Sequence, residues 1–208
     1  MIESSTSRNR EKALQTRRRL QAVARTIFAD RGYAKTSIEM IARAAGASIG
    51  GIYLRFTSKE DLYVSLLEDP LERIRVEFDQ LDRGMGAQLH EYWSVLKSWA
   101  TQSPEECRIL HMLASNNEMR ISPLTIDILS KDLSGIRTAL ENCITDGIGR
   151  GVYRSLDARE VASLMWSSFL GDLEAVQTHA NLGTVWVVEP INLRYDRTMR
   201  MIQEMLTP

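Results

Sequence analysis

The sequence predicts an all-α protein with a small basic N-terminal part and a larger acidic remainder, and three observations support this prediction. Apolar residues recur every three or four positions along most of the chain, which is the spacing of a buried helix face. Ser, Thr, Asp and Pro stand where such stretches begin, and Gly stands where several of them end, as expected of helix caps. Residues 1–60 hold 12 Lys and Arg against 5 Asp and Glu, whereas the rest of the chain holds 14 against 22. The N-terminal part is therefore the one suited to a polyanion.

The first 30 residues are expected to form a polar arm followed by one amphipathic helix. Residues 1–9 are polar and Ser-rich without an apolar period, so we predict a disordered arm. A helix is predicted from Arg10 to Asp30, with one apolar face formed by Leu20, Val23, Ala24, Ile27 and Phe28. The run Arg17–Arg19 lies on or beside the other face, either as solvated charge or as a phosphate contact through Arg18.

The stretch from Thr36 to Lys59 predicts two short helices and the start of a third. Thr36 precedes Glu39 by three residues, which is the spacing of a capping box, and the apolar face that follows stops at Gly46. Ser48 is the predicted N-cap of the second helix, and Ser58 with Asp61 repeats the signal for the third. In the second helix Ile52 and Phe56 share one face, while Ile49, Gly50, Gly51 and Tyr53 point elsewhere. Two short helices joined by a Gly-containing turn form a helix-turn-helix, whose second helix enters the major groove of DNA.

The residues A-A-G-A-S-I-G-G-I-Y-L-R-F-T-S-K-E-D-L resemble the tetracycline-repressor (TetR) family of bacterial transcriptional regulators. Small residues, a Tyr, a Phe and a Ser-Lys pair recur in that family at this spacing, and the likeness covers residues 15–66. The resemblance implies a DNA-binding domain at 1–57 and a helical domain for effector binding and dimerisation at 58–208. It also implies a homodimer that binds palindromic operator DNA, usually as a repressor, and leaves it when a small molecule enters the C-terminal domain.

The same resemblance assigns roles to single residues of the head. Thr36, Tyr53 and Lys59 would contact phosphates, and Ser48 would cap the recognition helix. Base reading would fall to Ile49, Gly50, Gly51 and Arg55. Ile49 can contact only a thymine methyl group, and Arg55 is the one residue of this set that could make a bidentate contact with guanine. We therefore predict that operator recognition depends strongly on thymine contacts and on DNA shape. The alternative for Tyr53 is a core aromatic side chain whose hydroxyl is satisfied locally.

Helical patterns continue through residues 58–151. Leu62, Leu66 and Leu67 carry a helix to Asp69, after which Pro70 either kinks it or begins a new one. Gly84-Met85-Gly86 reads as a linker, and a stripe containing Trp93 follows it. Ser103-Pro104-Glu105-Glu106 combines an N-cap, a Pro at the first helical position and a capping-box Glu. A long helix is then predicted over 124–148.

Two more helices complete the chain, and they resemble the pair through which the family dimerises. Asp157 with Glu160 caps the first of them. The apolar stretch 184–188 has no partner strand and is predicted as a loop. Glu189-Pro190 opens the last helix, whose apolar side is formed by Ile191, Tyr195, Met199, Ile202 and Leu206. The homodimer would form through these last two helices.

The effector pocket is predicted from large, deformable apolar groups and one polar anchor: Trp93, Met112, Asn116, Trp166 and Phe169. This set suits a small hydrophobic or aromatic ligand. Each Trp and Met has plain core packing as its alternative. The ligand's identity, the operator sequence, the target genes and the choice between repression and activation are not in the sequence.

Several function classes lose support from the sequence. His90, His111 and His179 have no metal-ligand spacing, and no motif for nucleophilic catalysis or for nucleotide phosphates is present, so we expect neither an enzyme nor a cofactor. The chain contains no long apolar run and no hydrophobic leader, so we expect a cytoplasmic protein with reduced cysteines. The remaining alternative to a ligand-released repressor is a DNA-binding regulator or architectural protein that lacks an effector and answers to a partner protein.

Overall fold

The computed structural model describes residues 2–83, 88–115, 119, 121–182 and 190–208, and this part of the chain contains ten α-helices and no strand. The all-α prediction is confirmed. The head consists of α1 (Ile2–Arg31), α2 (Ile38–Ala44), α3 (Ile49–Tyr53) and α4 (Lys59–Ser65). The body consists of α5 (Glu68–Arg83), α6 (Leu89–Gln102), α7 (Pro104–Ser115), α8 (Pro123–Gly149), α9 (Ala158–Leu182) and α10 (Ile191–Leu206).

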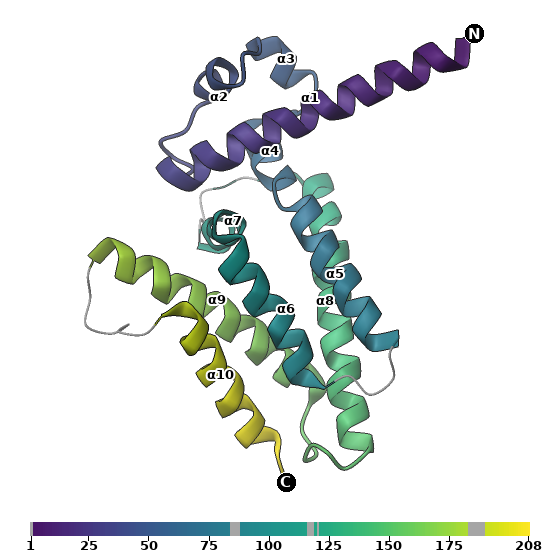
Figure 1. Ribbon diagram of the computed structural model, residues 1–208, viewed down its shortest axis with the longest axis vertical. Helices are drawn as coiled ribbons and strands as arrows, with labels where there is room; N and C mark the ends of the chain where they lie inside the picture. Colours follow the sequence, from purple (N-terminus) through teal and green to yellow (C-terminus); the bar gives the residue numbers. More distant parts are fainter. Residues whose placement is uncertain (1, 84–87, 116–118, 120, 183–189) are drawn as a thin grey trace.

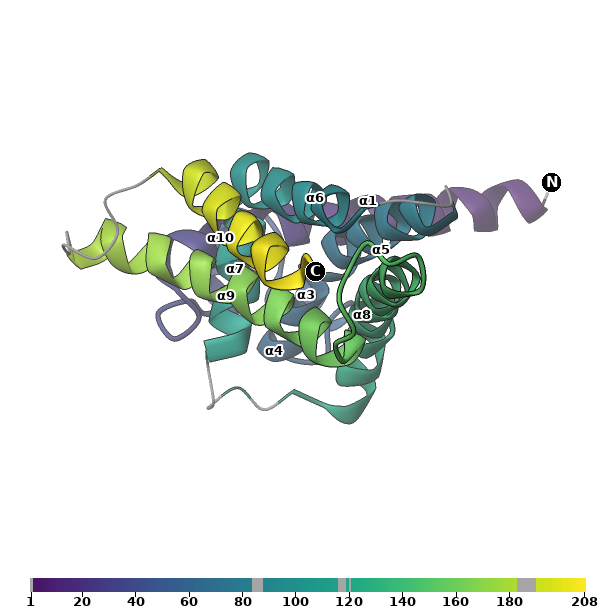
Figure 2. The same cartoon turned by 90° about the horizontal axis from the view of Figure 1, so that it is seen from below.

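The head lies across one end of the body, with α4 as the connection between them (Figure 1). In the body α5 packs along α8, α8 packs on α9, and α10 packs on both α9 and α6. One continuous apolar core runs from Leu20 and Phe28 in α1 to Leu206 at the end of α10. Seen from below, α9 and α10 occupy one side of the molecule and the N-terminal half of α1 projects from the opposite side (Figure 2).

Two expectations for the head need correction. Residues 2–9, predicted as a disordered arm, are helical because α1 begins at Ile2. They continue the backbone hydrogen bonding of the packed half of α1. The N-cap of α2 is Ser37 instead of Thr36, since the Ser37 hydroxyl accepts a hydrogen bond from the Met40 N–H at 3.3 Å. The predicted division at residues 57 and 58 falls at the N-cap of α4 and stays a prediction.

Pro70 does not kink a helix. The break comes earlier, at Leu66 and Leu67, and Pro70 lies in the first turn of α5, where a missing N–H costs no hydrogen bond. The structure thus resembles the alternative of two abutting helices. The expected linker 84–86 and the strand-like stretch 184–188 lie outside the described residues.

The remaining predicted helices are confirmed within a few residues. Ser58 caps α4 through the Asp61 N–H at 3.0 Å, and the Asp157 carboxylate accepts from the Arg159 N–H at 2.8 Å at the start of α9. Pro104 stands at the first position of α7 as predicted. Glu106, however, is not a capping-box residue, because its carboxylate is bonded to other helices as described below.

Candidate nucleic-acid interface

The helix-turn-helix is held by two Ser caps and one Gly turn. Ser48 is the N-cap of α3, and its hydroxyl accepts a hydrogen bond from the Gly51 N–H at 3.0 Å. Gly46, in the turn between α2 and α3, has a φ of +60°, a left-handed conformation that Gly adopts without strain. The Ser caps and the Gly46 turn together fix the direction of α3 relative to α2.

α3 has one face inside the head and one face in solvent, as the sequence predicted. Ile52 and Phe56 are buried in the core at 0% and 1% exposure. Ile49 and Tyr53 are 42% and 50% exposed, and Gly50 is exposed beside them. The reading of Tyr53 as a core aromatic residue is therefore wrong. The exposed face of α3, formed by Ile49, Gly50 and Tyr53, is a surface of low relief without an acidic group among its members.

The two adjacent glycines of α3 differ in what surrounds them. A Cβ added at Gly50 would meet no heavy atom within 4 Å outside its own turn of helix. A Cβ added at Gly51 would lie 3.1 Å from the Ser48 hydroxyl oxygen, which is the cap. Neither residue has a positive φ. Internal packing and backbone geometry thus give no reason for Gly at position 50.

Thr36, predicted to contact a phosphate, is not on this surface. It is 2% exposed, and its hydroxyl donates a hydrogen bond to the Gly32 carbonyl at 2.8 Å. Thr36 therefore ties the connection between α1 and α2 to the end of α1. It is omitted from the DNA-contacting set proposed below.

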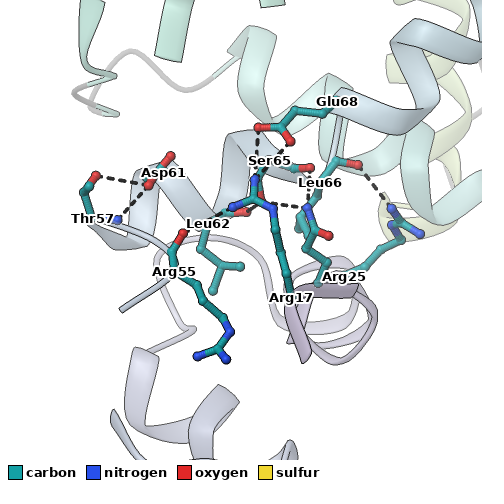
Figure 3. A network of polar contacts seen from close by, with 10 residues as sticks. Arg17, Arg25, Arg55, Thr57, Asp61, Leu62, Ser65, Leu66 and Glu68 are labelled. Atoms are coloured by element: carbon teal, nitrogen blue, oxygen red, sulfur yellow. Dashed lines mark hydrogen bonds and ion pairs between the residues drawn. The ribbon is translucent and has the colours of Figure 1, made fainter. Parts of the chain in front are cut away.

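Arg55 and Arg17 meet at the C-terminal end of α3 but have different tasks. The Arg55 guanidinium donates to the Gly51 carbonyl at 2.8 Å, and its Nε is buried without a hydrogen-bond partner in the described structure. Figure 3 shows the labelled Arg55 side chain pointing away from the network around Arg17. Arg17 donates to the Arg55 carbonyl at 3.2 Å, pairs with Glu68 at 3.0 Å and lies 4.6 Å from the centre of the Phe56 ring. Arg17 is a structural bridge between three elements of the head and body.

Burial affects the Arg17–Glu68 pair. Partial removal from water raises the pKa of Glu68 above its ordinary value, and the nearby Arg17 opposes that rise. The two residues that follow Arg17 in the sequence, Arg18 and Arg19, are exposed on α1. Of the three arginines, Arg18 and Arg19 are thus available to a phosphate and Arg17 is engaged inside the protein.

Lys59, at the first position of α4, lies over the Tyr33 ring with its ammonium nitrogen 4.0 Å from the ring centre. Partial burial lowers the pKa of Lys59. The Tyr33 hydroxyl donates a hydrogen bond to Glu60. Partial burial acts to raise the pKa of Glu60. The hydrogen bonds that its carboxylate accepts from Tyr33, from the backbone and from Ser58 outweigh this effect, and the pKa of Glu60 lies below its usual range. Lys59 is partly exposed at the surface of the head.

Two polar contacts that no sequence pattern predicted hold α4 in place, one to α1 within the head and one to α7 in the body. Gln21 of α1 donates to the Ser65 carbonyl at 3.0 Å, and Tyr63 of α4 donates to the Ile109 carbonyl of α7 at 2.8 Å. Figure 3 shows Ser65 beside Arg17, with Arg25 reaching the Leu66 carbonyl at 3.2 Å.

Glu106 of α7 is the centre of a second set of contacts between the head and the body. Its carboxylate accepts from Arg73 at 2.7 Å and from the Trp99 indole N–H at 2.7 Å, and it lies 3.7 Å from Arg25. Partners this far apart in sequence leave no local signal, which is why sequence reasoning missed them.

Two of the predicted effector residues belong to the buried aromatic core. Trp93 and Phe169 are 2% and 0% exposed and belong to an aromatic cluster with Trp99, Trp166 and Tyr195. The Trp93 indole N–H donates to the Tyr195 carbonyl at 2.8 Å, so this residue is core. Met112 is half-buried against the core, and Asn116 lies outside the described residues.

Trp166 lines a groove on the body. This groove, of about 450 Å³, lies between α8 and α9, with an apolar floor and polar groups around it: Ser130, Leu133, Ser134, Ile136, Arg137, Leu140, Ala162, Ser163, Trp166 and Ser167. Its size and composition are those of a small-molecule site.

A second groove, of about 540 Å³, follows the outer side of α9 and α10. Leu164 and Met201 on its walls are 43% and 62% exposed, and Gly171 adds no side chain between them. Asp172, which is 4% exposed, accepts from Arg194 at 2.5 Å and from Thr198 at 2.8 Å across the two helices. These contacts hold α9 and α10 in register beneath an uncovered apolar surface.

Other kinds of site find no support in the described part of the chain. It contains no cluster of three or more His, Cys, Asp or Glu residues arranged to hold a metal ion. Among its helices none is long and apolar enough to cross a membrane. Cys107 and Cys143 are both buried, and neither forms a disulfide bond.

Comparison with known proteins agrees with this geometry. A family model described as bacterial regulatory proteins of the tetR family matches residues 20–66, which run from the packed half of α1 to the end of α4. The HTH-type transcriptional regulator RutR of Escherichia coli K12 is 25% identical over 173 residues, 78% of this chain and 76% of RutR.

Solved structures show the same fold at lower identity. FadR of Bacillus subtilis in complex with stearoyl-CoA superimposes with a TM-score of 0.72 at 16% identity, covering 90% of this chain and 98% of FadR. The complex of SmeT with triclosan gives a TM-score of 0.74 at 15% identity, covering 93% of this chain and 92% of SmeT.

Proposed function

We propose that this chain is a TetR-family regulator that binds a two-fold symmetric operator as a homodimer, since the family model matches residues 20–66 and RutR is 25% identical over 173 residues. It is a DNA-binding transcriptional regulator of the helix-turn-helix type. The observation that carries the proposal is the exposed face of α3, with Ile49, Gly50 and Tyr53 in solvent on a frame fixed by Ser48. We place this regulator in the cytoplasm and assign it no catalytic reaction.

In this proposal each part of the head has a separate task on DNA. Tyr53, Lys59 and Arg18 contact phosphates and set the register, because all three are accessible to solvent. Ile49 packs on a thymine methyl, and Gly50 lets the backbone of α3 approach the floor of the major groove. Arg55 contacts a guanine only after its guanidinium leaves the Gly51 carbonyl. The division expected of the family, with a DNA-binding domain at 1–57 and an effector and dimerisation domain that begins with α4 at 58–208, is part of this proposal.

The dimer is proposed to form through α9 and α10. The uncovered apolar residues Leu164 and Met201 flank a groove with Gly171 at its centre, which suits close approach of a second helix pair. A two-fold dimer of this kind places two recognition helices about one DNA turn apart, roughly 34–36 Å.

Sedimentation or light scattering tests the dimer with a matched pair of variants. Met201→Glu puts a charge on the groove and is expected to give monomers. Val152→Glu puts the same charge on a residue that is 45% exposed between α8 and α9, and it is expected to remain dimeric. A dimeric Met201→Glu protein would show that the interface lies elsewhere.

We propose that a small hydrophobic or aromatic molecule releases the protein from DNA by binding the groove between α8 and α9. Its apolar floor, the half-buried Trp166 and the Arg137 guanidinium at its edge support this assignment. The ligands of the two related structures, stearoyl-CoA and triclosan, are consistent with this ligand class.

The dense aromatic cluster supports a second candidate, a regulator without an effector that is controlled by a partner protein. Trp93 and Phe169 fill the core where the sequence predicted a pocket. A thermal-shift screen of hydrophobic compounds separates the two candidates, since a ligand at 100 times its dissociation constant adds about 2.7 kcal/mol. Hits that shift the wild type but not Trp166→Ala support the groove, whereas a broad library without hits favours the partner-controlled regulator.

A further inference from the structure

The N-terminal half of α1 is a free-standing helix. Residue 8 and residues 10–15 are all exposed, including Leu14 at 51%, so this stretch has no buried face. The buried stripe of α1 begins only at Leu20, where the helix packs under α2 and α4. A stretch of helix without a buried face draws little stability from the rest of the fold. Its residues are therefore free to contact another molecule.

The exposed residues of this helix carry positive charge in a regular arrangement. Arg8, Lys12 and Arg19 are spaced by four and seven residues, so they lie along one stripe of the helix. At a rise of 1.5 Å per residue this stripe is about 16 Å long. Arg18 lies about a quarter-turn from this stripe and Arg10 lies on the opposite side of the helix, and Glu11 is the single acid between residues 8 and 19. Basic charge on an exposed helix beside a recognition helix fits a phosphate backbone.

The position of this helix says which phosphates it would reach. Arg17, at the base of the free-standing half, touches the C-terminal end of α3 through the Arg55 carbonyl at 3.2 Å. From there α1 runs outward, away from the side of the molecule that carries α9 and α10 (Figures 1 and 2). In a dimer joined through α9 and α10, the two free-standing helices point away from the two-fold axis. They would lie outside the paired recognition helices.

We infer that residues 8–19 form a second DNA-binding element, which binds the phosphate backbone flanking each operator half-site through Arg8, Lys12 and Arg19. This inference rests on the proposed operator binding and on the α9–α10 dimer. The element adds affinity and salt dependence without reading bases, because phosphate contacts carry no sequence information. Specificity stays with α3.

The test is the salt dependence of operator binding for Arg8→Gln/Lys12→Gln/Arg19→Gln, in which side chains of similar length lack the charge. Each lost phosphate contact lowers the slope of log affinity against log salt by about 0.9, so a dimer losing three per protomer loses about 5. The operator affinity is expected to fall by more than about tenfold near 100 mM salt, with the ratio of operator to scrambled DNA unchanged. The matched control is Arg108→Gln/Lys131→Gln/Arg154→Gln, three exposed cations of the body, which is expected to keep the wild-type slope.

Duplex length provides an independent readout. The wild type is expected to bind an operator with about ten added base pairs on each side more tightly than the bare operator. For Arg8→Gln/Lys12→Gln/Arg19→Gln, the gain in affinity from the added base pairs is expected to be much smaller. Hydrogen exchange of residues 8–19 should slow on the long duplex only. If Arg8→Gln/Lys12→Gln/Arg19→Gln keeps both the salt slope and the dependence on duplex length of the wild type, the inference is overturned, while operator binding by α3 is left intact. Failure of wild type itself to prefer its operator would instead overturn the proposed function.

Discussion

Gly50→Ala separates the stability of the head from its function. The added methyl group would meet no atom within 4 Å outside its own turn, and the backbone at this position is helical. Replacing Gly by Ala inside a helix stabilises by up to about 1 kcal/mol, and by roughly half of that here because α3 is only one turn long. For a chain of this size, 0.5 kcal/mol corresponds to a rise in melting temperature of about 1–2 °C.

The same methyl group would stand on the exposed face of α3, between Ile49 and Tyr53. If the backbone at Gly50 approaches the floor of the major groove, the methyl group holds it away, and operator affinity is expected to fall at least about tenfold, or 1.4 kcal/mol. Unfolding by urea and fluorescence anisotropy on operator DNA measure the two effects on one preparation. Greater stability with weaker binding is the expected combination.

Two other glycines serve as controls for this experiment. Gly149→Ala, at the end of α8, also meets nothing within 4 Å and is expected to raise stability without changing DNA affinity. Gly51→Ala brings its Cβ to 3.1 Å from the capping hydroxyl of Ser48, so it is expected to lower stability. Wild-type operator affinity in Gly50→Ala would refute the close approach of α3 to the groove.

Two further substitutions test the packing that supports the site. Tyr33→Phe removes the hydrogen bond from Tyr33 to Glu60. The pKa of Glu60 in the folded protein lies below its usual value of 4.5. The stability that the ionised Glu60 contributes is therefore complete above pH 4.5 and is lost as the pH falls through the pKa of the folded state. We expect Tyr33→Phe to cost at most about 1 kcal/mol at pH 7, because Glu60 is partly exposed, and less near pH 3 in urea titrations; an equal loss at both pH values would contradict this. Gly147→Ala places a Cβ 2.2 Å from the Tyr153 ring, which is held by the Leu89 N–H at 3.2 Å, and should cost about 1–3 kcal/mol against the stabilising control Gly149→Ala. Equal unfolding free energies for these two neighbouring variants would show that the ring moves aside freely.

Local signals in the sequence predicted the frame of the head well. Ser48 and Ser58 each precede an apolar period, and each forms the expected cap, because a cap is decided by residues within one turn. The same logic failed by one residue at Thr36. Ser37 beside it is an equally good cap, and the Thr36 hydroxyl is instead hydrogen-bonded to the Gly32 carbonyl.

Features that depend on distant partners were not predictable from the sequence. Glu106 reads as a capping residue until Arg73, Trp99 and Arg25 are brought to it by three other helices. Trp93 and Phe169 show why a pocket is hard to locate from sequence: a large apolar residue on a helix stripe gives the same pattern whether its neighbours fill the space beside it or leave that space open. The extent of α1 was missed because its first residues carry no apolar period, and such a period is what predicts a helix.

Specific operator binding through α3 is the central claim, and one measurement tests it most directly. Fluorescence anisotropy compares wild type and Tyr53→Phe on the DNA upstream of the protein's own gene and on a scrambled duplex, each across a range of salt. The account predicts that wild type prefers the native fragment by a factor of about 10³ or more, with a steep salt dependence and weaker binding once the Tyr53 hydroxyl is removed. Equal, weak binding of wild type to both duplexes, unaffected by Tyr53→Phe and repeated with DNA selected from random sequence, would contradict it.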